Sequence, residues 1–253
     1  MKRTLQSFFI AVFAFGASYS QQKEIWQPVQ KGQVAKIAKN TERELFPKDF
    51  KLFKAELSSL RQQLFVANSK GSRSVLISIP NADGGIEQFK VYEASNFTSE
   101  LQAQFPEIRA YKGDGVDDPY AQIRLSIDAS GIQAMIFRTA KKNEFIEPYS
   151  ADGTVYAVFN SSRQKGNLPF VCATAEQVLT QNLASRTASQ SLSTSTELLT
   201  FKLALSCNAE YANYFGATNA SQVSLVLAGF NATMTRVNGV FEKDFAIHMN
   251  IIA

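Results

Sequence analysis

Apolar and polar residues alternate over short runs between about residues 50 and 160, a pattern typical of β-strands. Residues 75–79 and 86–92 are β-rich, and a turn that contains Asn, Asp and Gly separates them, which predicts a hairpin. Residues 123–127 lead through another turn into residues 132–136, which predicts a second hairpin. This part of the chain is therefore expected to be a β-rich domain.

The second hairpin also predicts how the sheet is solvated. Its apolar positions alternate with Arg124 and Ser126, so one face is expected in the core and the other in water. Further short strands are predicted at residues 108–111, 145–146 and 155–159.

Two short helices are predicted within the β-rich region. Residues 57–64 carry leucines at helical spacing, with Ser58 or Ser59 available to cap the start. Residues 96–100 are expected to begin one or two helical turns, which Pro106 stops.

A different pattern begins near residue 198. Residues 198–205 predict a strand, residues 223–241 a long helix with apolar residues at spacings of three and four, and residues 247–251 a second strand. Gly229 and Gly239 are expected to weaken the helix modestly. Strand, helix and strand in this order predict a right-handed parallel crossover. The unit is too small for stability alone, so we expect that further chain follows it or that another surface covers it.

The remaining segments predict export and processing. Residues 1–20 have a basic start, an apolar stretch and a small polar end, as in a secretory signal peptide. Residues 180–200 contain ten Ser or Thr and no aromatic residue, which favours a linker open to proteases over an ordinary surface loop. Arg186 is the candidate processing site. The expected order is signal peptide, β-rich domain at 21–179, linker, and strand–helix–strand unit at 201–253.

Composition narrows the possible classes of function. Apolar residues make up 45% of the 253 residues and charged residues 19%, which excludes a disordered or polytopic membrane protein. Removal of Lys2 and Arg3 with the leader lowers the formal net charge from +4 to +2, a balance that implies no nucleic-acid partner. After the leader, no segment is long and apolar enough to span a membrane. Because His248 is the sole histidine, the chain cannot build a three-His zinc site.

Two stretches resemble the secreted bacterial reprolysin-like (adamalysin-type) zinc metallopeptidases of the metzincin group. Phe-Pro-Glu-Ile-Arg-Ala-Tyr-Lys-Gly at residues 105–113, with its continuation to residue 136, is similar to the family's propeptide. Residues 202–216 and 235–245 are similar to the opening of its catalytic domain. The resemblance implies an α+β chain, with a β-rich prodomain followed by the opening strand–helix–strand unit of a metzincin-like catalytic domain.

The resemblance also implies a function for the complete protein. The family holds zinc in H-E-x-x-H-x-x-G-x-x-H and hydrolyses peptide bonds of proteins or peptides with metal-activated water. This motif is absent here and no Glu follows His248, so we assign no catalytic or metal-ligating residue and expect His248 to be a partly buried structural residue. The chain is expected to be part of a secreted or periplasmic precursor whose prodomain binds the catalytic domain in cis. The alternative is a short exported binding or inhibitory module without catalytic activity.

The two cysteines leave three possibilities open. Pro169 and Cys172 partly resemble the family's P-x-x-C latency motif, although Ala173 stands where Gly is expected, and the Cys172 thiolate would then be an inhibitory zinc ligand. A disulfide between Cys172 and Cys207 is the second possibility. Two inert buried thiols beside apolar neighbours are the third.

A few charged and aromatic residues remain. The acidic run at 114–118 is interpreted as a turn rather than a calcium loop, because it lacks the alternation of a twelve-residue calcium site. Glu210, Glu242 and Asp244 are interpreted as solvated surface charges rather than structural ion contacts. The aromatic residues at 211, 214 and 215 are expected in the core.

Overall fold

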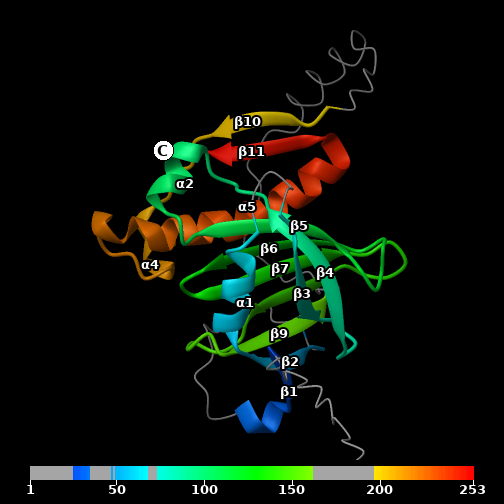
Figure 1. Ribbon diagram of the computed structural model, residues 1–253. Helices are drawn as coiled ribbons and strands as arrows, with labels where there is room; N and C mark the ends of the chain where they lie inside the picture. The colour runs from blue at the N-terminus through cyan, green and yellow to red at the C-terminus, as the bar shows by residue number, and fades with distance from the viewer. Residues whose placement is uncertain (1–24, 35–46, 48, 68–72, 162–196) are drawn as a thin grey trace, which may run out of the picture.

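The computed structural model describes residues 25–34, 47, 49–67, 73–161 and 197–253. These residues form an α+β fold in which strands predominate, with a curled nine-stranded antiparallel sheet, a two-stranded parallel sheet and helices packed on the large sheet (Figure 1). The order of the large sheet is β1-β2-β9-β8-β7-β6-β5-β4-β3. Its strands are β1 (Trp26–Val29), β2 (Lys51–Ala55), β3 (Val75–Pro80), β4 (Ile86–Glu93), β5 (Arg109–Gly115), β6 (Gln122–Asp128), β7 (Gly131–Phe137), β8 (Glu144–Pro148) and β9 (Val155–Asn160).

The remaining elements lie around this sheet. They are η1 (Lys31–Val34), α1 (Leu57–Leu64), α2 (Ser99–Gln104), β10 (Leu199–Leu203), α4 (Ala209–Tyr214), η2 (Ala220–Gln222), α5 (Val223–Phe245) and β11 (Ile247–Ile251). None of the helices in the described ranges is long and apolar enough to cross a membrane. The signal-peptide assignment, Cys172, Arg186 and residues 180–196 of the Ser/Thr-rich segment lie outside the described residues.

Both predicted hairpins are confirmed. β3 pairs antiparallel with β4, with Ile77 opposite Phe89, and β6 pairs antiparallel with β7, with Ile123 opposite Ile136. Asn81 shapes the first turn, because its Oδ1 accepts hydrogen bonds from the backbone N–H groups of Asp83 and Gly85.

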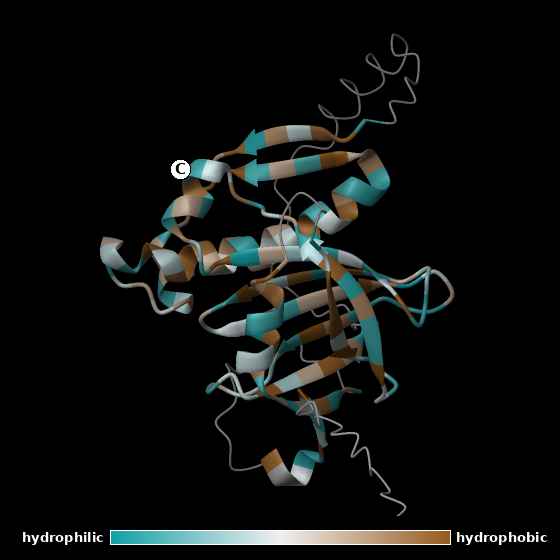
Figure 2. Cartoon of the chain, viewed as in Figure 1, coloured by the Kyte–Doolittle hydropathy of each residue, from teal (hydrophilic) through white to brown (hydrophobic). Residues whose placement is uncertain are grey.

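The sheet curls around α1, and the core lies between them. Leu60 and Leu64 of α1 are fully buried against apolar side chains from the inner face of the sheet, and the hydrophobic residues follow these strands (Figure 2). The curl brings the two end strands together. Trp26 Nε1 of β1 donates a 2.7 Å hydrogen bond to the Ser78 carbonyl of β3, and its ring packs edge-on against Tyr156.

The predicted cap of α1 is wrong. Glu56 occupies the N-cap position without a side-chain capping bond, and Ser58 Oγ instead donates to Glu56 Oε1 at 2.6 Å. The helix lies where it does because Leu60 and Leu64 fill the core, so packing rather than a cap determines its start.

Replacing Trp26 with Phe is expected to lower the free energy of unfolding by about 1–3 kcal/mol, because the variant keeps an aromatic ring but leaves the Ser78 carbonyl without its donor. Urea unfolding followed by circular dichroism measures the change. Tyr120→Phe is the control, since Tyr120 is 77% exposed and should change the free energy by less than about 0.5 kcal/mol. Equal losses for Trp26→Phe and Tyr120→Phe would contradict a stabilising role for the hydrogen bond that joins β1 to β3.

The prediction of a solvated outer face is wrong for β6. Ser126 is only 1% exposed and the Arg124 side chain 12% exposed, because α5 packs across β5, β6 and β7 (Figure 1). A helix more than a hundred residues later in the chain therefore covers the face that local alternation assigned to water.

The predicted parallel pairing of the last two strands is confirmed. β10 and β11 are parallel, with Leu199 opposite Ile247 and Leu203 opposite Ile251, and α5 connects them. Phe97, which follows β4, forms a parallel bridge with Ile251. The large sheet is thus the surface that covers the strand–helix–strand unit.

Candidate functional site

The interface between α5 and the large sheet is the candidate functional site, since it joins the two parts of the chain that differ in architecture. Its apolar part contains Leu227 and Met234 of α5 with Phe97, Leu101 and Ile108 from the preceding part of the chain. The spacing of three and four predicts one inward-facing stripe, and this holds in the middle of α5, where Leu227 and Met234 are buried and Phe230 and Val237 pack against the same cluster. The prediction is wrong at the two ends of the stripe, where Val223 is 45% and Phe241 36% exposed.

A buried network of polar side chains centres on Asn96. Asn96 Nδ2 donates to Asn231 Oδ1 at 2.9 Å and to Thr235 Oγ1 at 2.8 Å, and Asn96 Oδ1 accepts from Asn238 Nδ2 at 2.9 Å. These four residues are each less than 5% exposed. Asn231 Nδ2 also donates to the Arg109 carbonyl of β5 at 3.0 Å. Because each buried amide has partners, the network fixes the position of α5 on the sheet.

The same network closes one edge of the small sheet. Asn238 accepts from the Met249 N–H and donates to the Met249 carbonyl, so one side chain replaces a neighbouring strand. Farther along β11, the Ile251 N–H donates to the Asn96 carbonyl and the Thr98 N–H donates to the Ile251 carbonyl. β11 is therefore paired with β10 on one side and with residues 96–98 and 238 on the other.

Glu242, near the end of α5, is the centre of a charged cluster. Its Oε2 lies 3.0 Å from Arg124 and 3.2 Å from Lys112, and its Oε1 lies 2.7 Å from His248 Nδ1. Burial raises the pKa of Glu242, but the hydrogen bond with His248 and the charges of Lys112 and Arg124 outweigh burial and lower this pKa to about 2. The interpretation of Glu242 as a solvated surface charge is wrong, because its side chain is 9% exposed and connects α5 to β5, β6 and β11. Glu210 and Asp244 are exposed.

A second ion pair fastens the middle of α5. Arg236 Nη1 lies 2.9 Å from Glu147 Oε1, and Arg236 Nη2 donates to Gln133 Oε1 at 2.8 Å. The guanidinium also lies over the ring of Phe145. Since the Glu147 side chain is 1% exposed, Arg236 is the partner that its burial requires.

Gly239 lets the helix approach the sheet. A Cβ at this position would lie 2.8 Å from Arg124 Cγ and 3.1 Å from a ring carbon of Phe137. Gly229 makes room for a ring outside the sheet, because a Cβ there would lie 2.6 Å from the ring of Phe215, which follows α4. The predicted weakening of the helix by these glycines is thus offset by the packing they permit.

Gly239→Ala is expected to lower the free energy of unfolding by about 1–3 kcal/mol, because the added methyl group forces α5 away from Arg124 and Phe137. In an exposed helix the same substitution would be stabilising by up to about 1 kcal/mol, so the sign of the effect tests the contact. Thermal or urea unfolding gives the value. Ser224→Ala, nearer the helix start and half-buried, is the control, and a stabilised Gly239→Ala variant would contradict close packing.

Two hollows flank α5. A shallow groove of about 570 Å³ lies beside the Glu242 cluster, and Tyr92, Lys112, Thr200 and His248 are among its lining residues. A smaller pocket of about 110 Å³ lies between the start of α5 and the β6–β7 turn.

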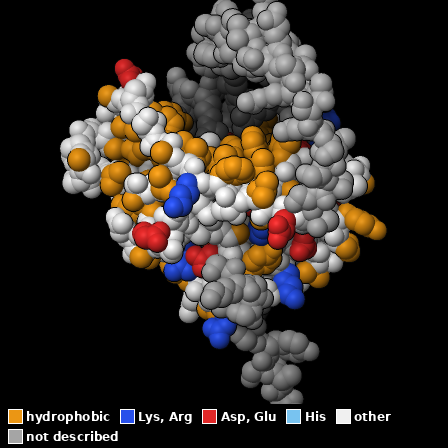
Figure 3. All heavy atoms as spheres, turned by 90° about the horizontal axis from the view of Figure 1, so that it is seen from above, with side chains coloured by type: hydrophobic (Ala, Val, Ile, Leu, Met, Phe, Trp, Pro, Cys, Tyr) orange, Lys and Arg blue, Asp and Glu red, His pale blue; other side chains and the backbone are white. Residues whose placement is uncertain are grey.

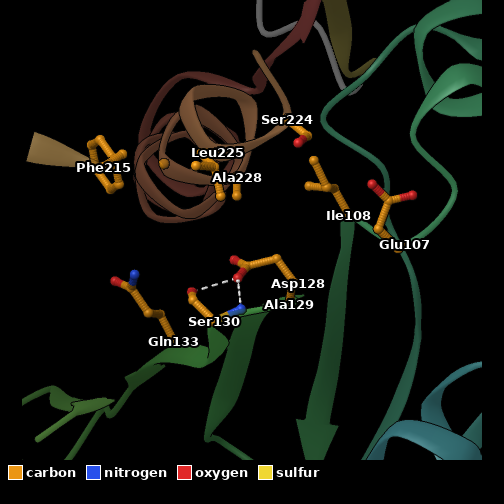
Figure 4. A pocket seen from close by; sticks show the side chains of 11 residues that line it. Glu107, Ile108, Asp128, Ala129, Ser130, Gln133, Phe215, Ser224, Leu225 and Ala228 are labelled. Atoms are coloured by element: carbon orange, nitrogen blue, oxygen red, sulfur yellow. Dashed lines mark hydrogen bonds between the residues drawn. The ribbon is translucent and has the colours of Figure 1, made fainter. Parts of the chain in front are cut away.

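The smaller pocket has one apolar and one polar wall. Leu225 and Ala228 of α5 face Asp128 and Ser130 of the turn (Figure 4). The Asp128 carboxylate accepts from both the N–H and the hydroxyl of Ser130, so it shapes the turn. Both of these hydrogen bonds lie within the β6–β7 turn, so they stabilise the turn.

The described residues do not fit a zinc site. They contain no group of three or more His, Cys, Asp or Glu side chains placed to hold a metal. Both ring nitrogens of His248 are used within the protein, with Glu242 and with Asn250 Oδ1 at 3.0 Å. The expectation that His248 is partly buried is confirmed by its 12% exposed side chain.

The other sequence-derived candidates are separate from this interface. Cys207 is an exposed free thiol, so the buried-thiol interpretation is wrong for it. In the acidic run, Asp117 accepts from the Gln88 N–H and Asp118 forms a 3.1 Å ion pair with Arg138, so these carboxylates bond to protein donors. Tyr214 is 56% exposed, and its assignment to the core is wrong.

Comparison with known proteins adds no family to this description. No protein-family model matches the chain, and no curated protein matches it either.

Proposed function

We propose that this chain is part of an exported precursor of a zinc-dependent endopeptidase, in which the β-rich unit holds a strand–helix–strand unit of the catalytic domain. The observation that carries the proposal is the docking of α5 on an antiparallel sheet through the Asn96 network and Glu242. The antiparallel sheet buries one face of the parallel β–α–β unit. A prodomain that stabilises its catalytic domain in cis would make a contact of this kind. The location in this proposal is secreted or periplasmic.

The chemistry of hydrolysis is not assigned to any described residue. Their donor set does not fit zinc, and H-E-x-x-H is absent from the sequence. What these residues do in the proposal is hold α5 and β11 in a fixed position relative to the large sheet. Zinc, the peptide substrate and the latency role of Cys172 belong to the complete precursor in this proposal.

The decisive experiment is to determine the reading frame beyond the codon for Ala253. An in-frame H-E-x-x-H-x-x-G-x-x-H, with peptide hydrolysis by the full-length product that a chelator abolishes and zinc restores, supports the proposal. A stop codon directly after Ala253 would overturn it and leave the exported binding module as the remaining function.

A cleavage experiment separates the two functions on the chain itself. With a specific protease site introduced after Arg186, the two fragments are expected to elute together after cleavage, because α5 packs directly on β5, β6 and β7 and Asn238 bonds to Asn96. The C-terminal fragment alone, residues 187–253, is expected not to unfold cooperatively, since the face of α5 that packs on the large sheet would be in water. Cooperative unfolding of that fragment alone would favour a self-contained binding module.

A further inference from the structure

Asn238 and Gly239 form the only Asn-Gly pair in the sequence, and both lie inside α5. An asparagine followed by glycine deamidates readily, because glycine has no Cβ to hinder its backbone nitrogen. That nitrogen attacks Asn238 Cγ, the Cγ–Nδ2 bond breaks, and the amide nitrogen leaves as ammonia with the proton of the Gly239 N–H. Water then opens the resulting succinimide ring and gives aspartate or isoaspartate.

The folded chain holds both reacting groups apart. Each N–H inside an α-helix donates to the carbonyl four residues earlier, which keeps the Gly239 nitrogen away from the side chain before it. Asn238 Nδ2 donates at 2.9 Å to Asn96 Oδ1 and at 2.9 Å to the Met249 carbonyl. Asn238 Oδ1 accepts from the Met249 N–H at 3.0 Å. The amide is thus fixed at both of its polar atoms and cannot turn towards Gly239.

The fold also keeps water from this pair. Asn238 is 2% exposed, and β11 and Asn96 cover its side chain. The view from the side of β10 and β11 shows hydrophobic side chains gathered on this face of the protein (Figure 3). Solvent therefore reaches residue 238 only when α5 separates from β11 and from the large sheet.

Neither product of the reaction fits the contacts that Asn238 makes. Aspartate would place a carboxylate oxygen where Nδ2 now donates, against the oxygens of Asn96 and Met249. If the Asn96 amide turned over to offer a donor, its oxygen would lie against Asn231 Oδ1. Isoaspartate adds a carbon atom to the main chain inside α5, which interrupts the helical hydrogen bonds.

We propose that Asn238 and Gly239 form a deamidation site that the docking of α5 keeps unreactive, and that reaction there prevents α5 from docking again. Gly239 has two effects. It allows α5 to approach Arg124 and Phe137, and it makes Asn238 labile once α5 has left the sheet. Separation of the two units thus becomes irreversible with time. The inference does not depend on the peptidase proposal, because it uses only the contacts of α5.

Peptide mapping by mass spectrometry tests the protection of Asn238. Residues 21–253 are incubated at mildly alkaline pH in buffer and in guanidinium chloride. Asn238 is expected to react at least about a hundredfold more slowly in buffer, because only the small open fraction of folded chains reacts. Asn219, which is exposed and followed by Ala220, is the internal control and should be slowed far less. Equal rates for Asn238 in the two solutions would overturn the proposal.

A variant connects the protection to the docking of α5. Asn96→Leu removes an acceptor of Asn238 Nδ2 and should raise the rate at Asn238 in buffer by at least about tenfold. Tyr120→Phe, at an exposed position, is the control and should leave the rate unchanged. An unchanged rate in Asn96→Leu would show that the helix alone protects Asn238, and would overturn the role of docking.

Refolding tests whether the reaction prevents docking. After timed incubation in denaturant, the chains are diluted into buffer, and limited proteolysis removes α5 wherever it is not docked. The surviving α5 is expected to retain asparagine at position 238. Asn238→Asp should lose this protection without any incubation, whereas Asn219→Asp should keep it. The proposal fails if deamidated α5 survives proteolysis in the same proportion as it occurs in the undigested sample.

Discussion

Replacing Asn96 with Leu is expected to lower the free energy of unfolding by about 4 kcal/mol. Leucine has a similar volume but no polar atoms, so Asn231, Thr235 and Asn238 each lose a hydrogen-bond partner inside the protein. A buried polar group left without a partner retains its full desolvation penalty. Urea unfolding, with the midpoint and slope both fitted, measures the loss.

Asn219→Leu is the matched control for this prediction. Asn219 is exposed and its side chain bonds only locally, to the Ser221 N–H and to Gln222, so the expected loss is about 1 kcal/mol or less. If Asn96→Leu cost no more than Asn219→Leu, the buried network would not hold α5. Elution of the two fragments after cleavage following Arg186 should show the same ranking, with Asn96→Leu releasing residues 187–253 first.

Glu242→Gln is expected to remove about 3 kcal/mol of stability at pH 7, and the loss should depend on pH. The pKa of Glu242 is lowered from 4.5 in the unfolded chain to about 2 in the folded protein, so its stabilising effect is complete above pH 4.5 and is lost as the pH falls towards 2. The difference in unfolding free energy between the two proteins should therefore shrink across that interval and vanish near pH 2.

Asp244→Asn, an exposed carboxylate on the same turn of α5, is the control for Glu242→Gln and should change stability by less than about 0.5 kcal/mol at either pH. Urea midpoints measured at several values between pH 2 and 7 distinguish the variants. A constant difference between the unsubstituted chain and Glu242→Gln over this interval would show that Glu242 contributes by packing rather than by charge.

The sequence was sufficient for elements defined by local pattern. The alternation at residues 123–127 predicts β6, and the leucines at 57–64 predict α1, because a strand and a helix each repeat over a few residues. The parallel β10–α5–β11 unit also follows from element order.

The candidate site could not be derived in the same way. Arg124 alternates like a solvent-facing residue, and only the packing of α5 on the sheet brings it to Glu242, 118 positions later. No local sequence pattern marks Asn96 or Asn238 as buried. Each is buried with the other as a hydrogen-bond partner, 142 positions away in the chain. Gly239 could be read only as a helix weakener, because the neighbour that requires it lies on another element. Long-range pairing of this kind has no local signature.

The Asn96–Asn231 contact has a consequence for the choice of expression host. Asn96-Phe97-Thr98 and Asn231-Ala232-Thr233 both match the acceptor pattern for N-linked glycans. In the folded chain these two amide side chains are buried and bonded to each other. A glycan added to either one in a eukaryotic secretory pathway would occupy the space where α5 meets the sheet. Production in a host without this modification preserves the contact.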